Sequence, residues 1–174
     1  MKRFAWQKYF AVLVAAFVFL AGCVKTEPVP TGKEYNFYEL KYLLLGKYSP
    51  LFYCDPDEYP IGINGEMYRQ RVLEQFEQIR RDTEKYNAIL ASLGVVNAEE
   101  FDGKKMVYEE NQLLNAIILE RKENGLYEFH LHRDLSSQGK MEQSLIISGI
   151  ITSTGKITVL EQKEGFNTCP ICSS

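Results

Sequence analysis

The chain has 174 residues, of which 45% are hydrophobic and 25% charged, and its formal net charge at pH 7 is −3. This length suits one domain with a single hydrophobic core. The chain is slightly acidic and has no block of basic residues, which argues against nucleic acid as a partner.

The first 22 residues have the parts of a secretory signal in the expected order. Three basic residues among the first eight are followed by an apolar run over residues 9–21, with small residues directly before Cys23. As a helix the run would reach about 20 Å, which is short of the ~30 Å hydrocarbon core of a bilayer. The segment is therefore predicted to be an export signal rather than a permanent membrane span.

The four residues Leu20-Ala21-Gly22-Cys23 resemble the lipobox of bacterial lipoproteins. The resemblance implies that residues 1–22 are removed and that the Cys23 sulfur carries a diacylglyceryl group. Two or more acyl chains anchor a protein far more firmly than one. We therefore expect a lipid anchor in the bacterial cell membrane or the outer membrane, with the domain outside the cytoplasm. The alternatives are an ordinary cleaved signal and an uncleaved N-terminal anchor.

The cysteine is followed by a predicted tether and then by a single domain. Residues 24–33 contain two prolines and a glycine among polar residues, a composition that favours extended chain. Residues 23–35 are therefore assigned to the lipidated cysteine and its flexible tether. The folded domain is predicted to span residues 36–168, and residues 169–174 form a tail with the pattern C-x-x-C.

The first half of this domain is predicted to be helical. Apolar positions within residues 36–47 fit a short amphipathic helix ending at Gly46, because Pro50 prevents its continuation. Over residues 66–93, apolar residues recur at alternating steps of four and three. This spacing predicts one long amphipathic helix, with Gly94 as its left-handed C-terminal cap.

Two further segments are interpreted from their turn and capping residues. Asn97 and Glu100 resemble a capping box that precedes one or two short helices over residues 101–114, with Gly103 between them. Residues 49–60 are rich in aromatic side chains but contain three prolines. That segment is predicted to be an ordered loop held against the domain by its side chains.

The second half of the domain is predicted to form strands. Residues 116–122 and 126–133 flank the pair Asn124-Gly125, and Asn-Gly is the strongest short signal for a β-hairpin. A second pair of strands is predicted at 143–152 and 156–162. The order predicts an α+β fold whose N-terminal helices, including the long amphipathic one, pack on an antiparallel sheet of about four strands.

Three cysteines remain once Cys23 is lipidated, so they cannot all pair with one another. Disulfides persist outside the cytoplasm, and we predict one between Cys54 and either Cys169 or Cys172. Cys169 and Cys172 have the spacing of a redox dithiol, but no helix can begin there because only two residues follow. The tail is therefore interpreted as structural rather than catalytic.

One predicted strand carries a possible set of metal ligands. Glu128, His130 and His132 alternate along it and so share a face, and the two histidines would need a third convergent group such as Glu128 to hold a metal. The preferred interpretation is a solvated face opposite the apolar one. No metal and no cofactor is predicted.

Other motifs for chemistry do not occur. The acidic run Asp55–Glu58 lacks the spacing of a calcium loop, and the chain has no Gly-rich phosphate loop, G-x-S-x-G or H-E-x-x-H. The preferred function is a membrane-anchored lipoprotein that serves as a binding or envelope-structural module for an unknown protein or small-molecule ligand. The alternatives are a thiol-redox or metal-handling envelope protein, and a small enzyme without a recognisable motif.

Overall fold

The computed structural model describes residues 32–54, 65–140 and 142–167 of the chain. The described residues from Lys33 onward form one compact unit. The predicted signal, Cys23, most of the tether and the C-x-x-C tail lie outside the described residues, so these assignments stay predictions.

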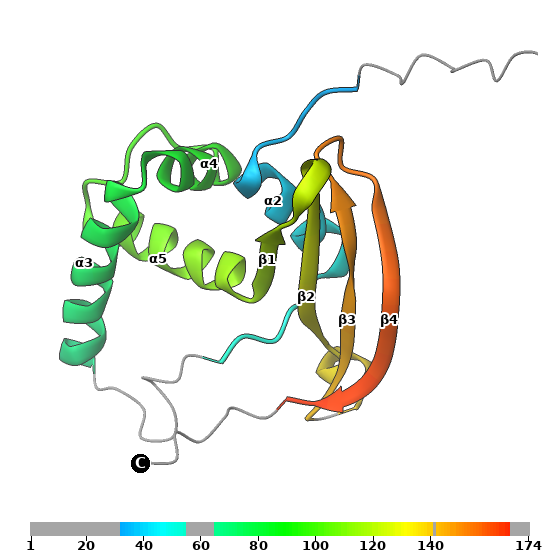
Figure 1. Ribbon diagram of the computed structural model, residues 1–174. Coiled ribbons are helices and arrows are strands. Elements are labelled where there is room, and N and C mark those ends of the chain that lie inside the picture. Colours follow the sequence, from blue (N-terminus) through cyan, green and yellow to red (C-terminus); the bar gives the residue numbers. More distant parts are fainter. Residues whose placement is uncertain (1–31, 55–64, 141, 168–174) are drawn as a thin grey trace, which may run out of the picture. The chain divides into compact units, whose positions relative to one another are not determined.

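Within the described residues, α-helices come first and β-strands follow (Figure 1). The helices are α2 (Phe37–Tyr48), α3 (Gly65–Arg81), α4 (Thr83–Leu93) and α5 (Phe101–Asn115). The strands are β1 (Ile117–Arg121), β2 (Leu126–Asp134), β3 (Gln143–Thr152) and β4 (Ile157–Phe166). None of these helices is long and apolar enough to cross a membrane. The predicted α+β class is confirmed.

The strands form an antiparallel meander in the order β1-β2-β3-β4. Both predicted hairpins are present, with a tight turn at Glu123–Gly125 between β1 and β2 and residues 153–156 between β3 and β4. On β2, Phe129 and Leu131 are buried while Glu128 is exposed, so the predicted alternation of faces is confirmed.

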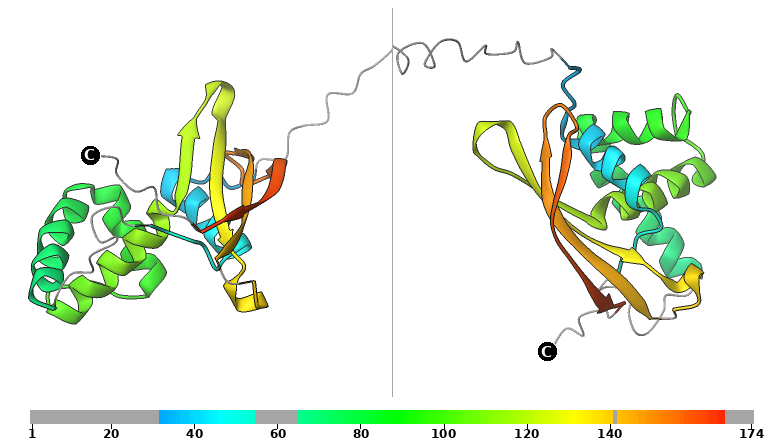
Figure 2. Two further views of the ribbon diagram at one scale, coloured as in Figure 1. Left: turned by 90° about the horizontal axis from the view of Figure 1, so that it is seen from below. Right: turned by 90° about the vertical axis from the view of Figure 1, so that its right-hand side faces the viewer.

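Helix α2 lies between the sheet and the other helices (Figure 2). Leu40 and Leu44 are fully buried in a cluster with side chains from β1, β2 and β3. Tyr38 and Tyr42 pack instead against a second cluster, which α3, α4 and α5 form. A helix that is apolar on most sides is also buried on most sides. Helix α2 therefore has two packing surfaces, whereas a single apolar stripe was predicted. It also continues past Gly46 to Tyr48.

The prediction of one long helix on the sheet is wrong in two respects. The chain leaves helical geometry at Asp82, whose carboxylate accepts a hydrogen bond from the Lys85 backbone N–H at 3.0 Å and so begins α4 as a separate helix. Moreover, α3 and α4 pack with α5 around Phe76 and Ile89, and α2 supplies the cover of the sheet. The apolar repeat runs through residue 82 without interruption, so periodicity alone could not locate the break.

The capping box is also at a different place from the one predicted. The side chain of Glu100 makes no capping hydrogen bond at the start of α5, whereas Asn36 and Glu39 form a complete capping box at the start of α2. Gly103 lies inside α5, and a Cβ there would be 3.0 Å from the Ala98 Cα. The glycine therefore permits close approach of Ala98 and does not divide the helix.

The start of the predicted aromatic loop runs beside β2. Leu51 forms an antiparallel bridge with Arg133, and the Phe52 N–H donates to the His132 carbonyl oxygen at 2.8 Å. The Pro50 carbonyl oxygen accepts from the Asp134 N–H at 2.9 Å. These contacts order residues 50–52 as expected, while residues 55–60 lie outside the described part of the chain.

Candidate binding cleft

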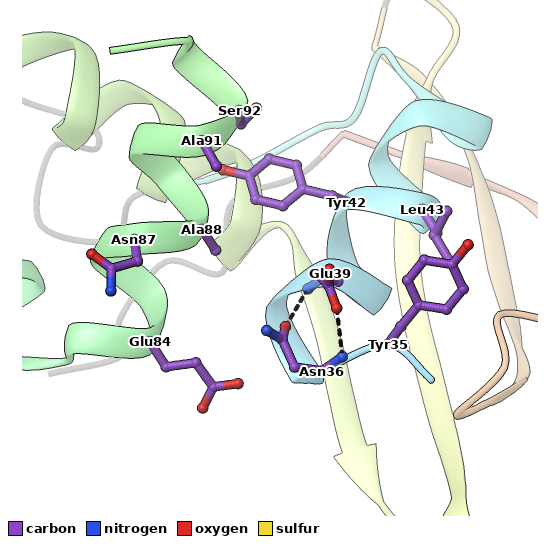
Figure 3. Close-up of a pocket in the computed structure, with 10 residues that line it drawn as sticks. All are labelled: Tyr35, Asn36, Glu39, Tyr42, Leu43, Glu84, Asn87, Ala88, Ala91 and Ser92. Carbon is purple, nitrogen blue, oxygen red and sulfur yellow. Dashed lines mark hydrogen bonds between the residues drawn. The ribbon is translucent and has the colours of Figure 1, made fainter. Parts of the chain in front are cut away.

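An open cleft of about 650 Å³ lies between α2 and α4 (Figure 3). It is lined by Tyr35, Asn36, Glu39, Tyr42, Leu43, Glu84, Asn87, Ala88, Ala91 and Ser92. The two alanines of α4 are small and leave room between the helices, whereas phenol rings, amides and carboxylates surround that room. The volume falls within the range of roughly 300–1,000 Å³ that small-molecule sites occupy.

The capping box positions two of the polar groups at the mouth of the cleft. The Asn36 Oδ1 accepts a hydrogen bond from the Glu39 N–H, and Glu39 Oε2 accepts one from the Asn36 N–H, both at 2.8 Å (Figure 3). These bonds satisfy N–H groups that the first turn of a helix otherwise leaves without partners. They also fix the orientation of the Glu39 carboxylate.

The second oxygen of this carboxylate binds a lysine from the end of the tether. Lys33 Nζ lies 2.9 Å from Glu39 Oε1 and 4.7 Å from the centroid of the Tyr35 ring. The hydrogen bond between the two side chains raises the pKa of Lys33 and lowers the pKa of Glu39. An ammonium group therefore rests on an aromatic ring and a carboxylate at one end of the cleft.

A hydrogen bond between α2 and the start of α4 sets the separation of the two walls. The Tyr38 hydroxyl donates to Asp82 Oδ2 at 2.5 Å, and the same aspartate caps α4. Burial, followed by the Asp82 carboxylate, raises the pKa of Tyr38, so the donor stays protonated at neutral pH. Lys85 Nζ lies 5.8 Å from the centroid of the Tyr38 ring.

The inner end of the cleft is formed by Tyr42, whose ring points toward α4 (Figure 3). Its hydroxyl oxygen is buried, and burial followed by the nearby Glu110 carboxylate raises the pKa of Tyr42. The Ser92 hydroxyl donates to Glu110 Oε1 at 2.9 Å. Carboxylates thus lie near both ends of the cleft, at Glu39 and at Glu110.

A partly buried lysine lies on another side of α2. Lys41 Nζ donates to the Leu114 carbonyl oxygen at 2.9 Å, in the last turn of α5, and lies 5.5 Å from the Phe37 ring centroid. A cation there stabilises the negative end of the α5 dipole. Burial, followed by repulsion from Lys85, nevertheless lowers the pKa of Lys41 from 10.5 to about 8.

This shift predicts a pH dependence of stability. Between about pH 8 and 10.5 the folded chain binds fewer protons at Lys41 than the unfolded chain, so the free energy of unfolding should rise with pH through that window. The raised pKa values of Tyr38 and Tyr42 act in the opposite direction only above about pH 10. Urea denaturation at a series of pH values from about 7 to 10 measures this change in the free energy of unfolding.

The substitution Lys41→Met should remove this rise with pH, whatever it does to stability at pH 7. The matched control is Lys47→Met, because Lys47 is an exposed lysine of the same helix. That control should keep the slope of the wild type. An unchanged slope in Lys41→Met would contradict the assignment.

The structure does not assemble the three residues considered as metal ligands. The rings of His130 and His132 are 5.3 Å apart between centroids, and burial followed by His130 lowers the pKa of His132. Glu128 pairs instead with Lys122, at 3.0 Å. Within the described ranges, no group of three or more His, Cys, Asp or Glu side chains is arranged to hold a metal ion.

The cysteine predictions extend beyond what the structure describes. Cys54 is half-buried and lies just after the segment that runs beside β2. Cys23, Cys169 and Cys172 all lie outside the described residues. The lipid attachment, the disulfide from Cys54 and the C-x-x-C tail therefore stay predictions.

No residue of the cleft was predicted from the sequence to belong to a functional site. Its walls come from residues 35–43 and 84–92, which are brought together only by folding. The pattern Asn36-x-x-Glu39 was the one local signal, since it marks a helix start with an oriented carboxylate. Comparison with known proteins finds no family model, no curated protein and no solved structure that matches this chain.

Proposed function

We propose that this chain is a lipid-anchored protein of the bacterial cell envelope whose domain binds a protein or small-molecule partner in the cleft between α2 and α4. The cleft is the observation that carries the binding role. It is open to solvent and large enough for a ligand, and it combines apolar floor residues such as Ala88 with oriented polar groups such as Glu39. Binding sites usually have this combination of apolar walls and a few fixed polar groups.

The short length of the predicted tether supports action close to a membrane. The folded domain begins at Lys33, beside the mouth of the cleft, and residues 24–32 separate Lys33 from Cys23. Fully extended, this segment would reach about 33 Å. A lipid on Cys23 would therefore keep the cleft within a few tens of ångströms of the bilayer surface.

The anchor is tested by labelling cells that express the full chain with radioactive palmitate. Wild-type protein should incorporate label and fractionate with membranes, while Cys23→Ala should incorporate none, because the acyl chains require the Cys23 sulfur and the amino group that cleavage exposes. The control is Cys172→Ala, which keeps the lipobox-like segment and should be labelled like wild type. Equal labelling of wild type and Cys23→Ala would refute the anchor.

A further inference from the structure

We infer that the mouth of the cleft is a recognition site for a primary alkylammonium group, such as the lysine side chain of a partner polypeptide, and that Lys33 occupies this site as an internal, displaceable ligand. The inference rests on the proposed binding role of the cleft and names the chemistry that it recognises. Lys33 Nζ contacts two groups, the Glu39 carboxylate and the Tyr35 ring. A carboxylate at 2.9 Å and an aromatic ring at 4.7 Å are complementary to an ammonium ion.

The receptor groups are held in place without Lys33. Glu39 is oriented by its second oxygen, which accepts the Asn36 N–H as part of the capping box. The Tyr35 N–H donates to the Ser153 carbonyl oxygen at 2.8 Å, and the Tyr35 ring lies against Gly155, where a Cβ would be only 3.1 Å from it. The carboxylate and the ring therefore keep their positions when Lys33 leaves, which is the condition for a preorganised site.

Lys33, by contrast, is held weakly. It is the first residue of the folded unit, and its side chain is 64% exposed. An exposed ion pair of this kind contributes little to stability, because solvent screens it and ordering the long side chain opposes it. A ligand that placed its own ammonium at Glu39 and made additional contacts inside the cleft would displace Lys33.

The remaining cleft residues supply such contacts and have the matching charge. Glu84 projects from α4 on the opposite wall, and Asn87 lies on the same helix among the lining residues (Figure 3). Apart from Lys33, which contacts Glu39 and Tyr35 at the mouth, no lysine or arginine lines the cleft as the structure describes it. A cationic side chain with a peptide backbone therefore meets carboxylates on both walls and an amide that forms hydrogen bonds with peptide groups. This complementarity favours a lysine of a partner polypeptide over an anionic or purely apolar ligand.

The test uses the full chain, isotope-labelled and purified in detergent, and follows the backbone amide signals of the cleft residues by NMR. The probe is Nα-acetyl-lysine N-methylamide, and its isostere Nα-acetyl-norleucine N-methylamide lacks the charge. Cadaverine serves as a free diamine. The lysine probe should shift the signals of Tyr35, Glu39 and Glu84 with a lower Kd than either of the other two.

Three variants separate the ammonium site from the cleft as a whole. Lys33→Met removes the internal ligand and should tighten binding of the lysine probe about two- to five-fold. Glu39→Gln should weaken it at least about ten-fold, although glutamine still completes a capping box and so preserves the start of α2. Lys47→Met is the control, because that lysine also lies over a tyrosine ring, at 5.4 Å from the centroid of Tyr48, and should leave Kd unchanged.

Each of the following outcomes contradicts the inference. Equal binding of the lysine and norleucine probes would do so while leaving a binding role for the cleft intact. Tighter binding of cadaverine would overturn a partner polypeptide as the source of the ammonium group. No tightening in Lys33→Met would show that Lys33 does not occupy the site. Absence of cleft shifts with every probe would remove the ammonium site, and the palmitate experiment would still decide the anchor independently.

Discussion

Replacing Leu44 by alanine is expected to lower the free energy of unfolding by about 2–5 kcal/mol. Leu44 is fully buried on the side of α2 that faces the sheet, within the cluster that includes Phe129 and Ile151. Truncation to alanine removes apolar contacts and leaves a cavity that close-packed neighbours fill only in part. Urea denaturation followed by far-UV circular dichroism gives the change.

The position of α2 adds a second expectation for this variant. Because α2 also contributes Tyr38 and Tyr42 to the helical cluster, loss of its packing on the sheet should weaken the whole domain. Circular dichroism and tyrosine fluorescence should therefore report one transition at the same lowered urea concentration. Leu113→Ala is the control, since Leu113 is 39% exposed on α5, and it should change stability by less than about 1 kcal/mol. A comparably small effect of Leu44→Ala would contradict the central role of α2.

Replacing Gly149 by alanine is expected to destabilise the domain by about 1–3 kcal/mol or more. Gly149 lies opposite Phe129 in the β2–β3 pair, and the register of β3 with β4 shifts beside it. A Cβ at this position would collide with the Thr158 carbonyl oxygen and lie 2.8 Å from Cε1 and Cζ of the Phe129 ring. The ring belongs to the core and the carbonyl to the backbone, so neither can move at low cost.

Another glycine provides the control for this substitution. A Cβ on Gly46, inside α2, would have no other atom within 4 Å. Gly46→Ala should therefore stabilise the domain by about 0.5–1 kcal/mol, because alanine loses less backbone freedom than glycine when a helix forms. Thermal unfolding should show a lower melting temperature for Gly149→Ala and a higher one for Gly46→Ala than for wild type, if the close packing at Gly149 is correct. The idea is wrong if Gly149→Ala is as stable as wild type.

Much of the secondary structure followed from local signals in the sequence. Turn residues at Asn124-Gly125 and alternating apolar residues around Phe129 predicted the hairpin and its buried face, and Gly94 adopts the left-handed cap conformation that was expected. Errors arose where two local signals competed. The apolar repeat of residues 66–93 concealed the helix start at Asp82, and Asn97 with Glu100 was interpreted as a capping box although the box lies at Asn36 and Glu39.

The site was less predictable than the fold. Glu128, His130 and His132 share a strand face by simple alternation, but the pairing of Glu128 with Lys122 could not be read from spacing alone. The cleft depends on α2 meeting α4, and this contact joins Tyr38 to a residue 44 positions away. Such long-range pairs leave no periodic trace in a single sequence, because each partner obeys only its own local rules.

The sequence by itself was enough to predict the α+β class and the hairpins, because turns and alternation are encoded by neighbouring residues. It also predicts a lipid anchor at Cys23, because a signal-type N-terminus is likewise a local pattern. Only the tertiary structure decided that α2 rather than the longer helical segment covers the sheet. The physical reason is that an apolar stripe specifies which side of a helix avoids water but not which surface it meets. The same limit hid the cleft, whose tyrosines and carboxylates become neighbours only when α2 packs between the sheet and the helices.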